Sequence, residues 1–233
     1  MKIIKVKAGF VMLVLTLIML SWGFGYSKEN DLGLQSTQAI GEKRVLIVVV
    51  RFPDATPKVP LEMVKQRAVS GLNAYVIEQS YGLASLKTDF RGYITLPSSL
   101  SKYKVSQYNN QVDAGRVRKL IEDTMTILEK DVDFSSYDHM LIIPAVYTTP
   151  GDGYGMICYC ANPGMLTPIT RLTFGSQSKG ERATHYETLR SKGGKEFKGG
   201  VFVGAENAHL GMFAHDYFHA LGGVYDRGKR FAP

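Results

Sequence analysis

Val45-Leu-Ile-Val-Val-Val50 is an unbroken apolar run in which five of the six residues are β-branched. A run of this length and composition is typical of a strand that is buried on both faces, which requires helices on both sides of the sheet. The segment 51–57, Arg-Phe-Pro-Asp-Ala-Thr-Pro, ends the run because its prolines cannot continue a sheet ladder. The run therefore predicts a central strand of a sheet with helical layers.

Helical and strand-like patterns alternate along the chain after this run. Residues 61–80 carry apolar side chains at the spacing of an amphipathic helix, and Gly82 is expected to end that helix. Helical spacing recurs in residues 112–128 and 208–221, and strand-like runs occur in residues 86–96, 137–146 and 201–203. Residues 147–200 are irregular and rich in Gly and Pro, so they are expected to be functional or to carry small strands of their own. The alternation predicts an α/β or α+β sandwich.

The first 25 residues form a separate segment. Three lysines precede an apolar run over residues 8–20, and Gly23 and Gly25 follow, which is the pattern of a secretory signal peptide cut after Gly25. The alternative is an uncleaved anchor, because residues 8–25 carry no charge and are just long enough to span a bilayer. Residues 26–43 then form a linker or a short pro-segment, and residues 44–233 form one domain. The protein is expected to be secreted, and to be bound to a membrane only if residues 8–25 stay attached.

The positive charge of the chain does not indicate a nucleic-acid partner. The 233 residues carry a formal charge of +7, and removal of residues 1–25 takes away three lysines and no acid, which leaves +4. The remaining basic residues are scattered and match no nucleic-acid-binding motif. No nucleic-acid partner is expected.

The sequence His215-Asp-Tyr-Phe-His219 carries the strongest chemical signal. Two histidines four residues apart on a helix share one face, and two neutral imidazoles at that spacing can bind one Zn²⁺. Asp216 follows the first histidine, and a carboxylate there can take a proton from water at the metal. Gly222-Gly223 allows a turn that would bring Asp226, or less favourably Tyr225, into reach as a third ligand.

The segment 214–223, Ala-His-Asp-Tyr-Phe-His-Ala-Leu-Gly-Gly, resembles the HExxHxxG segment of the immune inhibitor A-like metallopeptidases, which are secreted zinc endopeptidases related to the metzincins. Weaker similarities to that family lie at residues 45–54, 79–86 and 131–138. The resemblance implies a zincin-like N-terminal lobe, in which a twisted mixed sheet packs on a long active-site helix.

The same resemblance implies roles for individual residues. It implies that His215 and His219 bind Zn²⁺ and that Asp216 takes the place of the family's general-base glutamate. Asp226 would stand near the position of the family's third zinc ligand. It lies one residue further along the chain than the family's spacing implies, and Tyr225 occupies that nominal position. The substrates implied are extracellular proteins or peptides, hydrolysed by metal-activated water.

Two departures from the family leave alternatives open. Asp216 is one methylene shorter than glutamate, and the chain stops at Pro233, where the family continues into a C-terminal lobe that this chain would lack. The chain is therefore expected to be an active endopeptidase, or alternatively a catalytically inactive extracellular binding module or a membrane-anchored surface protein. Cys158 and Cys160 are two positions apart, a spacing that does not favour a disulfide within a strand.

Overall fold

The computed structural model describes residues 39–104, 113–149, 158–163, 166, 186–221, 224–226 and 229–231, the last two ranges by their backbone. The main sheet contains five strands: β1 (Gly41–Arg51), β2 (Ala84–Thr95), β3 (His139–Pro144), β4 (Cys158–Asn162) and β7 (Gly200–Gly204). The helices are α2 (Leu61–Lys65), η1 (Gln66–Gly71), α3 (Leu72–Gln79), η2 (Leu100–Lys102), α4 (Ala114–Leu128), η3 (Phe134–Ser136) and α5 (Leu210–Ala220). Two small hairpins pair β5 (Leu189–Arg190) with β6 (Glu196–Phe197), and β8 (Val224–Asp226) with β9 (Lys229–Phe231).

The five strands lie in the order β2-β1-β3-β7-β4. β1 pairs in parallel with both β2 and β3, and β3 pairs in parallel with β7. β4 pairs antiparallel to β7 and forms one edge of the sheet. The sheet is therefore mixed, as expected, and its antiparallel edge strand comes from within the irregular stretch 147–200.

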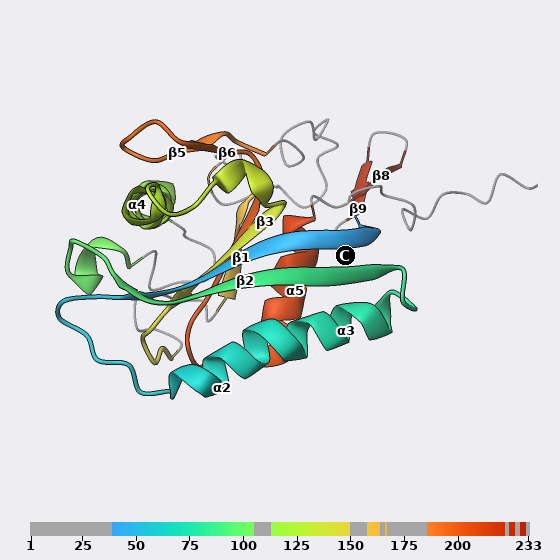
Figure 1. Ribbon diagram of the computed structural model, residues 1–233, viewed down its shortest axis with the longest axis horizontal. Helices are drawn as coiled ribbons and strands as arrows, with labels where there is room; N and C mark the ends of the chain where they lie inside the picture. The colour runs from blue at the N-terminus through green and yellow to red at the C-terminus, as the bar shows by residue number, and fades with distance from the viewer. Residues whose placement is uncertain are drawn as a thin grey trace, which may run out of the picture.

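Helices cover both faces of the sheet (Figure 1). Leu46, Val48 and Val50 of β1 pack in the cluster that includes α4, whereas the alternate residues, Val45 among them, pack in the cluster that includes α3 and α5. All six residues of the 45–50 run are completely buried, which confirms the prediction of a strand covered on both faces. The α/β fold class is therefore as the sequence predicted.

The first helical region extends without a break from Leu61 to Gln79, as predicted, but its middle third is a π-helix, η1. Gly82 ends the region: it adopts a φ of +79°, and its N–H donates to the carbonyl of Ile77 at 2.8 Å. A positive φ suits glycine, which carries no Cβ, so the predicted stop at this residue is confirmed.

The amino-terminal predictions lie outside the described residues, which begin at Ala39. They include the signal peptide over residues 1–25 and the alternative anchor over residues 8–25. Within the described ranges, none of the helices has both the length and the apolar character needed to cross a bilayer.

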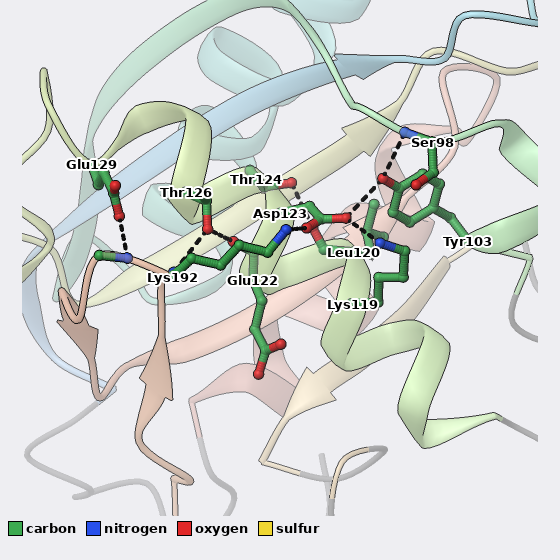
Figure 2. Close-up of polar contacts among 11 residues, drawn as sticks. Ser98, Tyr103, Lys119, Leu120, Glu122, Asp123, Thr124, Thr126, Glu129 and Lys192 are labelled. Carbon is green, nitrogen blue, oxygen red and sulfur yellow. Dashed lines mark hydrogen bonds and ion pairs between the residues drawn. The ribbon is translucent and has the colours of Figure 1, made fainter.

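A buried carboxylate joins α4 to the β5–β6 hairpin (Figure 2). Asp123 is 3% exposed, and its carboxylate accepts hydrogen bonds from Tyr103 Oη at 2.9 Å and from Lys119 Nζ at 2.6 Å. Lys192 Nζ lies 3.1 Å from the other oxygen. Burial alone would raise the pKa of Asp123, but the hydrogen bonds from Lys119, Tyr103 and Lys192 outweigh it and hold the pKa below its usual value. The charged form of this residue therefore stabilises the contact between helix and hairpin.

Replacing Asp123 with alanine is expected to lower the free energy of unfolding by about 2 kcal/mol, because the buried Tyr103 hydroxyl loses its acceptor. The two lysines are partly exposed and can turn to water, which limits the loss. For a domain of this size, the change corresponds to a fall in Tm of about 4–8 °C, measurable by thermal unfolding. Glu122→Ala is the matched control, because the Glu122 carboxylate points away from the cluster in Figure 2. Equal Tm values for the two variants would contradict the assigned role of Asp123.

Candidate metal centre

Helix α5 brings the two predicted histidines together. Its side chains Phe213, Ala214, Tyr217 and Ala220 are buried, chiefly in the cluster beneath the sheet. His215 and His219 are about 40° apart around the helix axis, on the side away from these apolar residues. Their Nε2 atoms are 3.1 Å apart and their ring centroids 4.6 Å apart. The two imidazole nitrogens converge at the surface of the helix, as the spacing predicts.

The start of α5 differs from the expected start at residue 208. The N-cap is His209, and the nearby Asn207, a residue type that commonly caps helices, does not cap this one. Asn207 instead accepts a hydrogen bond from the Thr148 N–H at 3.1 Å and donates to the Thr148 carbonyl at 2.8 Å. An asparagine amide can satisfy both backbone polar groups of one residue, so Asn207 joins the β7–α5 loop to the segment after β3.

Asp216 lies at the border between the buried face of α5 and the histidine pair. It is three residues before His219, which makes the two side chains neighbours on the helix surface. The residue is 5% exposed, and its carboxylate accepts a hydrogen bond from the backbone N–H of Cys160 in β4. Its Oδ2 has no hydrogen-bond partner among the described residues. Burial raises the pKa of Asp216 to about 7, against the opposing effect of the Cys160 hydrogen bond. A carboxyl group with such a pKa can both release and take up a proton near neutral pH, as acid–base catalysis requires.

The donor set of the histidine pair fits zinc. Zinc–imidazole bonds are about 2.0–2.1 Å long, so two nitrogens 3.1 Å apart can both reach a single ion. Among the described side chains, no group of three His, Cys, Asp or Glu residues could hold a metal ion. The predicted third ligand, Asp226, lies in β8, and its side chain, like that of Tyr225, is outside the described residues. The assignment of these three ligands thus remains a prediction.

Two residues that the sequence did not single out position the loop before α5. Arg67, in the π-helix η1, donates to the carbonyls of Glu206 and Ala208. Glu206 is 1% exposed, and one of its carboxylate oxygens accepts the Lys58 N–H at 2.8 Å. Burial raises the pKa of Glu206, although the N–H groups of Lys58 and Val59 oppose the shift. These contacts join residues far apart in sequence, so no local pattern could reveal them.

The cysteines of β4 lie beneath the sheet, on the side of α5. Cys158 and Cys160 are buried in the same cluster as Phe213, and they do not form a disulfide. Burial raises the pKa of the Cys158 thiol, and the nearby Asp216 raises it further. Gly204 allows this close packing, because an added Cβ would lie 2.3 Å from the Phe213 ring and 2.6 Å from Cys158 Sγ. These thiols are therefore packing residues at the border of the candidate site.

A hollow lies at the amino ends of β1 and β3. Its volume is about 540 Å³, and His139, the first residue of β3, lines it. His139 is 4% exposed, and its ring meets Tyr217 of α5 edge-on at 5.4 Å. Burial lowers the pKa of His139 to about 4; the charge of Asp138 opposes this shift, and that of Lys43 adds to it. His139 is therefore neutral in the folded protein at neutral pH.

The depressed pKa of His139 makes stability depend on pH. The His139 ring takes up a proton near pH 6.5 in the unfolded chain and only near pH 4 in the folded chain. Its contribution to the free energy of unfolding is therefore complete above pH 6.5 and is lost as the pH falls toward 4. Between pH 7.5 and 5, we expect the parent to lose about 2 kcal/mol relative to His139→Phe, which keeps a ring against Tyr217. Urea unfolding of both proteins measures this difference. The two proteins are compared because the raised pKa of Asp216 increases the free energy of unfolding as the pH falls through this range, which opposes the effect of His139. If the free energies of unfolding of the parent and of His139→Phe change equally with pH, the burial of a neutral His139 is contradicted.

No protein-family model and no curated protein matches this chain. Among solved structures, the chain is similar to metalloproteinase-II from Bacteroides fragilis, with a TM-score of 0.41 and 12% sequence identity. The match covers 82% of this chain and 46% of that chain, so this chain spans less than half of the length of that structure. Similarity at this level assigns neither a family nor an activity, and the immune inhibitor A-like family is not supported.

Proposed function

We propose that this chain is an exported zinc-dependent endopeptidase that hydrolyses extracellular proteins or peptides. The observation that supports this proposal most strongly is the 3.1 Å separation of the Nε2 atoms of His215 and His219. Two imidazole nitrogens at that distance, beside a buried carboxyl group, form a donor set suited to zinc and to acid–base chemistry. The distant similarity to a metalloproteinase adds no weight at its present level.

In this proposal, His215 and His219 hold the ion, and Asp226 completes the protein ligands. A bound zinc ion polarises a carbonyl group and makes water more acidic. Asp216 takes the proton of the attacking water on Oδ2, which has no partner in the described part of the chain, and returns that proton to the leaving amine. The Cys160 N–H holds the carboxylate beneath β4 and so fixes its orientation.

A second candidate function is a non-catalytic binding module of the same fold. It is favoured by the placement of Asp216, whose short side chain is held on the buried side of α5 by the β4 backbone. A displacement of about 1 Å at a reacting centre can lower a rate about 100-fold. A membrane-anchored surface protein is a further alternative. Sequencing the amino terminus of the exported protein tests it, because an intact Met1 would favour the anchor.

Hydrolysis of an unfolded, fluorescently quenched protein substrate tests the proposal. Activity should require zinc: a chelator should abolish it, and stoichiometric Zn²⁺ should restore it. Zinc binding without hydrolysis would favour the non-catalytic module. A chain that retains no zinc after exposure to it would contradict the zinc-dependent endopeptidase.

A further inference from the structure

The hollow at the amino ends of β1 and β3 is a candidate site of its own. Its volume, about 540 Å³, lies in the range of small-molecule sites. Its walls come from four separate regions of sequence: Lys43 in β1, residues 134–139 around η3 and the start of β3, Tyr186, and residues 196–199. Neither histidine of the candidate metal centre lines it.

His139 supplies a buried polar atom that lacks a partner. The residue lines the hollow and is 4% exposed, and its Nδ1 has no hydrogen-bond partner within the described part of the chain. Gly200, the neighbour of His139 across the β3–β7 pairing, keeps space beside this nitrogen, because an added Cβ would lie 2.6 Å from Nδ1. Buried polar groups are normally hydrogen-bonded, so an orphaned nitrogen at the wall of a hollow indicates a partner from outside the chain.

The charges around the hollow favour an anion. The charged side chains that line the hollow are balanced: Lys43, Lys198, Asp138 and Glu196. Those that contact its lining are three cations and two carboxylates: Arg44, Arg91, Arg190, Asp89 and Asp133. Glu196 is shared between Arg190 at 2.6 Å and Lys198 at 3.3 Å. Further out, Lys195 adds a positive charge near Asp133. The net local charge is therefore positive, which attracts negative ligands.

The walls also present aromatic rings. Phe134, Tyr137, Tyr186 and His139 all line the hollow. The two tyrosine hydroxyls already donate hydrogen bonds, Tyr137 to Asp89 at 2.6 Å and Tyr186 to the Ala220 carbonyl at 2.7 Å. Their rings are thus held in place as apolar walls, and such walls favour an aromatic ligand. We propose that this hollow binds a small carboxylate that carries an aromatic ring, with the carboxylate toward the lysines and a hydrogen bond to His139 Nδ1.

A titration of the whole protein with N-acetyl-L-phenylalanine tests this proposal. The five histidines give few imidazole NMR signals, and the His139 signal is assigned by its loss in His139→Phe. We expect a saturable shift of that signal with a Kd of about 1 mM or tighter. The neutral amide of the same compound should bind at least about fivefold more weakly, and so should acetate, which lacks the ring.

Charge variants locate the binding. Lys43→Met combined with Lys198→Met should weaken binding about fivefold, whereas Lys102→Met, which removes one cation outside the lining, should leave it unchanged. The titration is repeated with a chelator present, so that binding of a carboxylate to zinc at the histidine pair is excluded. The proposal is overturned if the His139 signal does not move at about 10 mM ligand. It is also overturned if the shift requires zinc, or if the amide binds as well as the acid.

Discussion

Replacing Asp216 with glutamate is expected to raise the rate of peptide hydrolysis about 100-fold. The carboxylate of Asp216 is buried beneath β4, where the Cys160 N–H holds it, while the histidine pair lies on the neighbouring, outer side of α5. One added methylene extends the carboxylate from the border of the buried face toward the pair. The measurement is kcat/KM on the quenched protein substrate, at equal zinc content.

The control for this prediction is Asp216→Asn, which keeps the size of the side chain and removes its basicity. This variant should bind zinc as the parent does and should show no hydrolysis. If the glutamate variant hydrolyses the substrate and the parent does not, the parent is the non-catalytic module. If the asparagine variant is as active as the parent, Asp216 is not the base.

Replacing either His215 or His219 with alanine is expected to weaken zinc binding at least about 100-fold, because each imidazole supplies one of a small number of bonds to the ion. Competition with a chromophoric chelator measures this affinity. His209→Ala is the matched control, because His209 is exposed and occupies the N-cap position of the same helix without joining the pair. Equal losses in all three variants would show that zinc binding responds to damage of the helix and not to the loss of a ligand.

The strands and helices that show a clear pattern of apolar residues could be predicted from the sequence. The 45–50 run predicted a strand buried on both faces because no polar residue interrupts it, and all six residues are buried. Helices α4 and α5 and the region from α2 to α3 followed from apolar spacing. β4 could not be found in this way, because its five residues are short, lie inside a Gly- and Pro-rich stretch and pair with β7, about 40 residues later.

In the candidate site too, the local geometry could be predicted and the long-range contacts could not. The convergence of His215 and His219 follows from helical geometry alone, so the sequence was sufficient. The position of Asp216 depends on β4, and the loop before α5 depends on Arg67 and Glu206, all of which are long-range contacts. Asn207 shows the limit of a local rule, because a residue that commonly caps helices binds the Thr148 backbone instead.

The most direct test of zinc binding by α5 is a titration of the metal-free protein with Zn²⁺, followed through the imidazole nitrogen signals of its histidines. We expect that one ion binds per chain, and that the Nε2 signals of His215 and His219 shift together and saturate at the same point. Zinc that leaves these two signals in place, or that shifts only one of them, would contradict the shared site.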